Sequence, residues 1–332
     1  MIVFHDPAEV PAGFGPSVVA IGKFDGVHAG HRAILERAKA DAARTGAAVV
    51  AVTFDRNPLA TLRPDRCPED VSGLHQKLEL LAETGLDAVL VLRFDAQMAA
   101  QPAEEFIERV LVAALNVQTI LVGRDFRFGK GGAGTPELLE RFGQRLGFRV
   151  DLIGDVHGEA AERRVSSTWV RELLTAGDVA GATMLLGRPH AVWGEVVHGL
   201  KRGRALGFPT ANLSPQMEGF VPGDGVYAGW LVDEGPRTSG GSDDDGDAGR
   251  GILRPRVRHP AAISVGTNPT FDDVPVRVVE AYVLDETDLD LYGHDVQVQF
   301  VQRVRGMVAF DGVEALKAQM ADDVARVREL LA

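Results

Sequence analysis

Cysteine and long apolar runs are the features that this sequence has least of. The single cysteine, Cys67, excludes an intramolecular disulfide and any metal site built from several thiolates. Apolar runs such as 47–54 and 88–92 have the length of β-strands and are far too short to cross a bilayer. The N-terminus places acidic and proline residues where a secretory peptide needs a basic start and an apolar run. We therefore expect a mature cytoplasmic protein with no membrane association.

Positive charge is also scarce. The chain has 35 Lys and Arg against 47 Asp and Glu, which gives a formal net charge of −12. Nucleic-acid binding requires a clustered Lys and Arg surface that displaces counterions from the phosphate backbone. We therefore expect no nucleic-acid partner, and nothing in the sequence implies an obligatory protein partner. An anionic small substrate has to find locally positive sites.

The length of 332 residues and an apolar content of 45% favour two domains. The first half alternates helical patterns with short apolar runs, which predict buried parallel strands at 17–21, 47–54, 88–94 and 118–122. This alternation is typical of a doubly wound α/β sheet. Two short helices are expected at 169–175 and 179–186, and Gly187-Arg188-Pro189 ends the second one. We place the domain boundary there, between residues 1–187 and 188–332.

The second half has a different period. Its runs alternate apolar and polar residues with a period of two, at 193–198, 226–232, 262–265, 276–284 and 295–301. They predict a small antiparallel β-barrel, against which an amphipathic C-terminal helix over 312–331 can pack. Residues 234–258 are rich in Gly, Ser and Asp and bury too little apolar area to fold, so we expect a disordered insert there. The consecutive acids 243–245 within it indicate a solvated loop rather than a cation site.

A glycine-rich turn from Gly22 to His31 joins the first expected strand to a helix that begins near His31. Glycines let the backbone approach phosphates, and a helix N-terminus offers free N–H groups and a positive dipole end. His28 and His31 lie three residues apart, so both rings can donate hydrogen bonds as charge grows on a bound phosphate. One histidine alone would indicate a helix cap or a buried hydrogen bond. Two histidines that flank Gly30 in this context favour nucleotidyl transfer.

A second anion site is expected where Ser166, Ser167 and Thr168 precede a helix with Arg171 on its first turn. The simplest interpretation is a helix N-cap. Hydroxyl groups, a helix N-terminus and an arginine fork together also match a polyphosphate. Asp125 follows another expected strand, at the edge where ligands of open α/β sheets gather.

The second half contains a basic loop from His198 to Gly207, in which glycine N–H groups and Lys or Arg heads can wrap a polyphosphate. Such a loop is about equally often solvated surface. Thr210 and Asn212 follow it, and they place a hydroxyl and an amide oxygen on one strand face, which suits a phosphate-bound Mg²⁺. Glu280 lies in an apolar strand, either as a general base for an alcohol or as a strand-edge carboxylate that faces water.

Together these motifs resemble the bacterial bifunctional riboflavin kinase/FAD synthetases over nearly the whole chain. The stretch 22–31 resembles the HxGH signature of nucleotidylyltransferases, and the run from Pro209 to Asn212 resembles the flavokinase PTxN motif. The resemblance implies a transferase that phosphorylates riboflavin to FMN and adenylylates FMN to FAD, with ATP as co-substrate and Mg²⁺ as cofactor. Adenylylation would belong to the α/β domain and phosphorylation to the barrel domain.

The resemblance also implies roles for individual residues. His28 and His31 act in adenylylation, and Glu280 deprotonates the ribityl 5′-hydroxyl in phosphorylation. Thr210 and Asn212 hold the metal. The expected flavin-binding residues are Asn57, Asp125 and Arg303, and the expected ATP-binding residues are Gly22, Phe24, Gly30, Ser166, Thr168, Arg171, Gly199, Lys201 and Gly207.

One position departs from the family pattern. The family typically reads TFDPHP where this chain has Asn57 in the run Thr53 to Pro58, so an asparagine replaces a histidine that helps to bind substrate or polarise phosphate. Asparagine donates a neutral hydrogen bond but carries no positive charge, which leaves Arg56 as the candidate to supply it. Two other functions therefore stay open: a riboflavin kinase with an impaired adenylyltransferase domain, and a flavin-binding regulator without turnover. The intact catalytic groups argue against the regulator.

Overall fold

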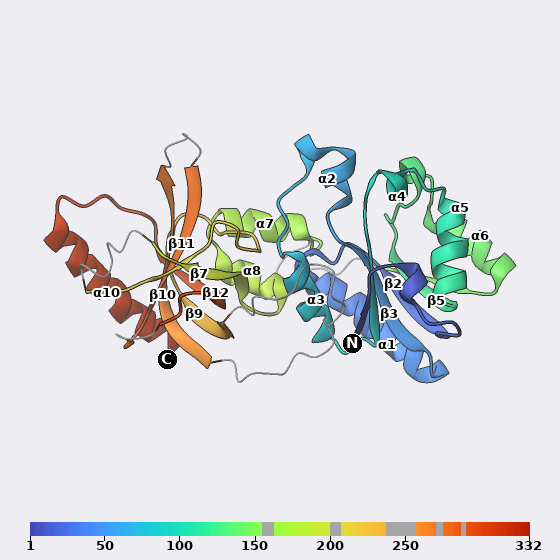
Figure 1. Cartoon of the computed structure of the whole chain (residues 1–332), viewed down its shortest axis with the longest axis horizontal. Helices are drawn as coiled ribbons and strands as arrows, with labels where there is room; N and C mark the ends of the chain where they lie inside the picture. Colours follow the sequence, from blue (N-terminus) through green and yellow to red (C-terminus); the bar gives the residue numbers. More distant parts are fainter. Residues whose placement is uncertain (155–162, 200–206, 237–256, 270–274, 287–289) are drawn as a thin grey trace. The chain divides into compact units, whose positions relative to one another are not determined.

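A computed structural model of the chain describes all residues except 155–162, 200–206, 237–256, 270–274 and 287–289 (Figure 1). The described residues form two compact units, which divide between Ser166 and Ser167. The boundary predicted at residue 187 lies two helices further along the chain. Within the described part of the chain, no helix is long and apolar enough to cross a membrane.

The first unit is built on a six-stranded parallel sheet with the strand order β1-β4-β3-β2-β5-β6 (Figure 1). This confirms the predicted α/β class with a parallel sheet. The four predicted strands are present, and the short β1 and the edge strand β6 were not predicted. The strands are β1 (Ile2–Phe4), β2 (Ser17–Ile21), β3 (Ala48–Phe54), β4 (Ala88–Leu92), β5 (Val117–Gly123) and β6 (Arg149–Ile153).

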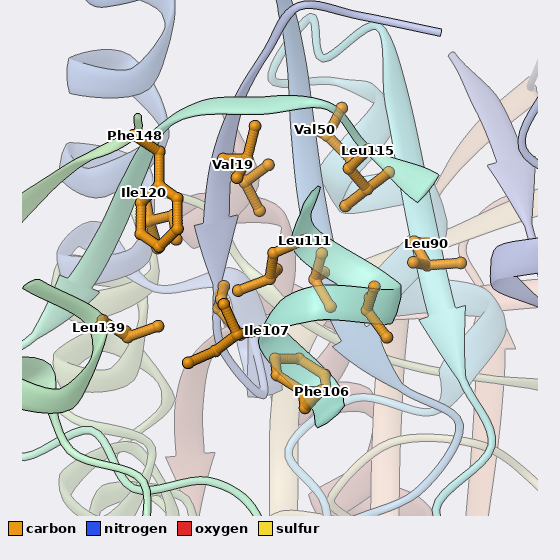
Figure 2. Packing of buried hydrophobic residues seen from close by; sticks show 14 of the residues in the cluster. Val19, Val50, Leu90, Phe106, Ile107, Leu111, Leu115, Ile120, Leu139 and Phe148 are labelled. Atoms are coloured by element: carbon orange, nitrogen blue, oxygen red, sulfur yellow. The ribbon is translucent and has the colours of Figure 1, made fainter. Parts of the chain in front are cut away.

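Helices cover both faces of this sheet, and this explains why its inner strands read as continuous apolar runs. On one face of the sheet, α1 (Ala29–Thr45) and α3 (Leu74–Ala82) pack against alternate residues of β2 and β3, such as Ala20 and Ala51. On the other face lie α5 (Ala103–Phe106), the π-helix Ile107–Ala114 and α6 (Pro136–Leu146). Figure 2 shows Phe106, Ile107 and Leu111 of this second layer beside Val19, Val50 and Leu90 of the sheet. The shorter helices are α2 (Pro58–Leu62), α4 (Ala96–Ala100) and the 3₁₀ turns Pro7–Glu9, Asp25–Val27, Pro64–Arg66 and Lys130–Gly132.

The second unit is a closed antiparallel barrel with the strand order β10-β11-β8-β7-β12-β9, and it confirms the predicted barrel. Two helices, α7 (Ser167–Thr175) and α8 (Val179–Leu186), precede it in the chain. The strands are β7 (His190–Val197), β8 (Ala211–Leu213), β9 (Gly225–Pro236), β10 (Val257–Pro269), β11 (Pro275–Val283) and β12 (His294–Arg305).

The predicted C-terminal helix is α10 (Val313–Leu331), which packs on the barrel. Its buried Val327 contributes to a cluster with Ala228 and Leu284. A bidentate ion pair adds a polar anchor, because Nε of Arg305 lies 2.9 Å from Oδ1 of Asp323 and Nη2 lies 2.7 Å from Oδ2. An arginine fork that matches a buried carboxylate in this way fixes the angle of the helix on β12.

Both ends of the predicted insert 234–258 lie in strands. β9 continues to Pro236, which pairs with His294 of β12, and β10 begins at Val257, which pairs with Asp233 of β9. Backbone pairing with neighbouring strands therefore orders both ends of a segment whose composition predicted disorder. Residues 237–256, with the acidic run 243–245, lie outside the described residues.

Candidate active sites

The histidine-bearing turn between β2 and α1 has a strained backbone. Phe24 and Val27 adopt positive φ values of 50° and 38°, a region that side chains with a Cβ seldom occupy, and Gly26 lies between them with φ 74°. A strained conformation of this kind persists only where contacts with the surrounding structure hold it in place, and such conformations are found most often at functional sites. Helix α1 begins at Ala29, so His28 is its N-cap residue, slightly earlier than the start that the sequence predicted.

The two histidines of this turn lie face to face. The ring centroids of His28 and His31 are 3.8 Å apart with an interplanar angle of 17°, and Phe24 packs against His31 at 5.2 Å. Among the described residues, Nδ1 of His31 has no hydrogen-bond partner. Burial, followed by the nearby charges of His28 and Lys23, holds the pKa of His31 well below its usual value. At neutral pH His31 is therefore a neutral ring that can donate one hydrogen bond.

The glycines of the turn make room for these rings. A Cβ at Gly30 would lie 3.2 Å from the imidazole of His28, and a Cβ at Gly22 would lie 3.4 Å from the ring of Phe24. Gly22 also donates its N–H to the carbonyl of Val52 at 3.1 Å, which continues the pairing of β2 with β3. Phe24 is only 1% exposed, and its buried ring packs against the ring of His31. Contact of these three residues with ATP stays a prediction.

Asn57 lies at the start of α2 and is buried. Its side-chain oxygen accepts a hydrogen bond from the N–H of Leu59 at 3.2 Å, so it caps the helix, and this role was not expected from the sequence. The neighbouring Arg56 pairs with Asp55 at 3.0 Å and is 56% exposed. Asn57 and Arg56 line a pocket that also contains Lys23 and the buried Lys77, which sequence reasoning had missed.

Asp125 is held by an arginine that the sequence analysis did not single out. Nη1 of Arg164 lies 3.1 Å from the Asp125 carboxylate, and both side chains are about half exposed or more. Arg164 is also one of the nearby charges that lower the pKa of His31. The first unit ends here, with Ser166 as its last residue.

Thr168 and Arg171 lie on α7, which belongs to the second unit. Helix α7 begins at Ser167, so Ser167 and Thr168 form its first turn and do not precede it as the sequence suggested. Only Ser166 of the predicted serine and threonine run lies before the helix. The joint action of Thr168 and Arg171 with the histidines stays a prediction.

The barrel brings its predicted catalytic and metal-binding residues together. Glu280 of β11 pairs in register with Asn212 of β8, and the hydroxyl of Thr210 lies 3.3 Å from the Glu280 carboxylate. The amide nitrogen of Asn212 donates to the hydroxyl and the carbonyl of Thr210, both at 3.2 Å, which leaves the Asn212 amide oxygen on the other side. A carboxylate, a hydroxyl and an amide oxygen thus form one cluster. Within the described residues, no group of three or more His, Cys, Asp or Glu could hold a metal ion.

Two positions in the loop before β8 require glycine, each for a different structural reason. A Cβ at Gly199 would lie 2.5 Å from the side chain of Asn212, so only glycine lets that amide occupy its position. Gly207 has a φ of 89°, which glycine adopts without strain. Next to it, Phe208 packs edge-on against Tyr282, two residues after Glu280. Lys201 lies outside the described residues.

Arg303 of β12 makes contacts within the second unit. Its guanidinium donates to the carbonyl of Ala176 at 3.1 Å and to the carbonyl of Asp224 at 2.6 Å. These bonds join the barrel to the turn after α7. A flavin contact for Arg303 stays a prediction, and the structure gives this arginine a supporting role in the fold.

Comparison with known proteins decides the family. A model of the FAD synthetase family matches residues 12–169, and a model of the riboflavin kinase family matches residues 186–331. The bifunctional riboflavin kinase/FMN adenylyltransferase of Escherichia coli K12 is 36% identical over 94% of this chain and 92% of its own length. The protein of the same description from Listeria monocytogenes is 33% identical over 95% and 92%. The chain belongs to the bifunctional riboflavin kinase/FMN adenylyltransferase family.

A solved structure agrees with this family assignment at the level of fold. A crystal structure from Streptococcus pneumoniae, described as a macrolide-efflux protein, is 30% identical and covers 98% of both chains with a TM-score of 0.82. The resemblance inferred from the motifs is therefore confirmed, as is the expectation of a transferase with two activities. Enzymes of this family use ATP with a divalent metal, which agrees with the oxygen-rich cluster around Thr210 in the barrel.

Proposed function

We propose that this member of the family carries out its two reactions at two separate sites. Phosphorylation of riboflavin takes place at the cluster of Glu280, Thr210 and Asn212, and adenylylation of FMN takes place at the turn that carries His28 and His31. The single observation that supports this division most strongly is the register of β8 and β11. It sets a carboxylate beside two neutral oxygen ligands in the barrel, in a unit that contains neither histidine.

In the kinase site, Glu280 is the group that can accept a proton. The 5′-hydroxyl oxygen of riboflavin attacks the γ-phosphorus of ATP, its proton passes to the Glu280 carboxylate, and ADP leaves. Thr210 and Asn212 would hold Mg²⁺ through the hydroxyl and the amide oxygen, since hard cations prefer such ligands. When bound, Mg²⁺ neutralises charge on the transferred phosphate. The 3.3 Å contact between Thr210 and Glu280 keeps the base next to the oxygens that would hold the metal.

In the adenylylation site, the reaction needs hydrogen-bond donors more than a base. A phosphate oxygen of FMN attacks the α-phosphorus of ATP, and pyrophosphate leaves. His28 and His31 donate N–H bonds to the phosphate oxygens on which charge develops. The neutral state of His31 suits this role, because a neutral ring still carries one N–H. Ser166, the last residue of this unit, would contribute to binding of the polyphosphate.

One experiment separates the remaining functions. Purified protein is incubated with riboflavin, ATP and Mg²⁺, and the products are resolved by chromatography, with a parallel sample that contains a chelator. We expect FMN and FAD to form, and neither to form with the chelator. FMN without FAD would indicate a kinase with an impaired adenylyltransferase, and the absence of both products would indicate a flavin-binding regulator.

A further inference from the structure

Buried polar residues hold the histidine turn to the loop before α3, which lies about 46 positions further along the chain. The carboxylate of Asp25 accepts hydrogen bonds from the N–H groups of Val71 at 2.7 Å and Ser72 at 3.3 Å. In the reverse direction, the hydroxyl of Ser72 accepts a hydrogen bond from the N–H of Gly26 at 3.1 Å. Asp25, Ser72 and Lys77 are each about 8% exposed, and we call them the polar clamp.

Lys77 extends this connection to the end of β3. It lies on α3, directly after the Ser72 loop, and its ammonium group donates to the carbonyl of Phe54 at 2.7 Å. A further hydrogen bond joins the end of β3 to the histidine turn, because the hydroxyl of Thr53 donates to the carbonyl of Lys23 at 3.1 Å. The ends of β2 and β3 are thus held to each other directly and also through the loop before α3.

The segments that the polar clamp holds are those that carry the site. Gly26 immediately precedes Val27 and His28, in the turn with three positive φ values. Phe54 immediately precedes the segment 55–58, which contains Asn57. The clamp residues and Asn57 also line the same pocket. A shift at either end would therefore change the spacing between the histidines and Asn57.

The chemistry of Lys77 indicates that it serves more than folding. Burial lowers the pKa of its ammonium group, and the carboxylates of Asp70, Asp25 and Asp55 oppose that shift. A buried charge contributes less to stability than a well-packed apolar side chain, since its desolvation offsets much of the attraction. Leu74 and Leu81 on the same helix pack with the apolar core, whereas Lys77 lines the pocket and donates to the carbonyl of Phe54.

We propose that Ser72 and Lys77 are positioning residues for adenylyl transfer, which set the histidine turn at a fixed distance from the Asn57 segment. The inference rests on the proposed assignment of adenylylation to this turn. Donors that stabilise a transition state act only when they are preorganised, and a displacement of about 1 Å can cost on the order of a hundredfold in rate. The polar clamp supplies that preorganisation to a turn whose own backbone is strained.

The test uses the full chain, because its kinase site is an internal control in the other unit. Ser72→Ala removes the acceptor for Gly26, and Ser72→Thr keeps a hydroxyl. Lys77→Met removes the donor to Phe54 at nearly constant length. The matched control is Lys39→Met, since Lys39 also donates to a backbone carbonyl, that of Thr84 at 2.9 Å, away from the pocket. For each variant we would measure kcat and KM for FMN in FAD synthesis, riboflavin kinase activity and thermal unfolding.

We expect Ser72→Ala and Lys77→Met to lower kcat for FAD synthesis by about tenfold to a hundredfold with a nearly unchanged KM for FMN. Ser72→Thr should recover most of the rate, and kinase activity should stay at the wild-type level. FAD synthesis within twofold of wild type in both variants, equal losses in Lys39→Met, or no recovery in Ser72→Thr would overturn the inference. If Lys77→Met fails to fold, the two Ser72 variants decide alone. His31→Ala is measured alongside: full FAD synthesis in that variant would refute the site assignment itself, independently of the polar clamp.

Discussion

The two candidate sites are built in different ways. The kinase cluster lies where two strands of the barrel pair: the register of β8 and β11 sets Glu280 opposite Asn212, and Thr210 directly precedes β8, 3.3 Å from the Glu280 carboxylate. The adenylylation site lies on a strained turn, and its supporting contacts come from residues about 46 positions away, such as Ser72 and Val71. Backbone pairing between two strands is enough to hold side chains on neighbouring strands beside each other. A turn with positive φ values needs partners from elsewhere in the chain.

This difference predicts where each site is vulnerable. The kinase site should be sensitive to loss of its reacting groups and tolerant of changes outside the barrel. The adenylylation site should also be sensitive to residues that never touch substrate. Substitutions of Glu280, His31 and Asn57 test this contrast, and a substitution of His190 adds a buried histidine for comparison.

The largest effect is expected for Glu280→Gln, which keeps shape and removes the base. Loss of a positioned general base typically costs about a hundredfold to ten-thousandfold, so riboflavin phosphorylation should nearly vanish. FAD formation from supplied FMN should be unchanged, as measured by chromatography of both products. A parallel loss of both activities would contradict two separate sites.

A smaller effect is expected for His31→Ala in the other unit. Removal of one preorganised donor costs about a hundredfold to a thousandfold in kcat, by analogy with oxyanion holes, with little change in KM for ATP. Riboflavin kinase activity should be intact. A loss that appears in KM with an unchanged kcat would show that His31 binds the ground state and does not act on the transition state.

The sequence predicted the parts of both sites that are carried by local patterns. The glycine-rich turn singled out His28 and His31, the run from Pro209 to Asn212 singled out Thr210 and Asn212, and the apolar strand pattern over 276–284 singled out Glu280. Ser72, Lys77 and Arg164 were missed, because what marks them is a partner far away in the chain. Lys77 did carry a weak signal, as a lysine within the otherwise amphipathic run Leu74–Ala82. The capping role of Asn57 could have been predicted from Pro58, because proline is favoured in the first turn of a helix and asparagine at the position before it. Comparison with the family pattern pointed only to the missing histidine.

A third test concerns a buried histidine that belongs to folding rather than to catalysis. His190 on β7 is 3% exposed and its Nε2 lies 2.6 Å from the carbonyl of Phe220; burial lowers its pKa to about 4. In the unfolded chain the pKa is about 6.5, so as pH falls below that value the unfolded state takes up the proton first. The stability contributed by neutral His190 is therefore complete above pH 6.5 and is lost down to about pH 4, by about 3 kcal/mol in total.

Denaturant unfolding of the wild type and of His190→Gln between pH 4 and pH 8 measures this contribution. Glutamine keeps a neutral amide donor and does not titrate, so the difference in unfolding free energy between the two proteins should change with pH in that window. A constant difference would show that His190 is not the titrating group. The two histidines can then be compared, because burial lowers the pKa of both His31, on the proposed adenylylation turn, and His190, on a barrel strand.

The smallest effect is expected for Asn57→His, which restores the family residue. A histidine can carry a positive charge, and a charge-assisted hydrogen bond to phosphate is roughly twice as strong as a neutral one. Arg56 already lines this pocket, so the gain in FAD synthesis should be only a few-fold. The substitution also removes the side-chain oxygen that caps α2, at a cost of about 1 kcal/mol in stability.

Asn57→Ala separates these two effects, because it removes the cap and adds no cation. Both variants should unfold at similarly lowered denaturant concentration, whereas only Asn57→His should exceed the wild-type rate of FAD synthesis, with FMN affinity measured alongside. An unchanged or lower rate in Asn57→His would mean that the pocket is complete without the histidine. In that case Arg56, which lines the same pocket, supplies the positive charge that the family pattern places at position 57.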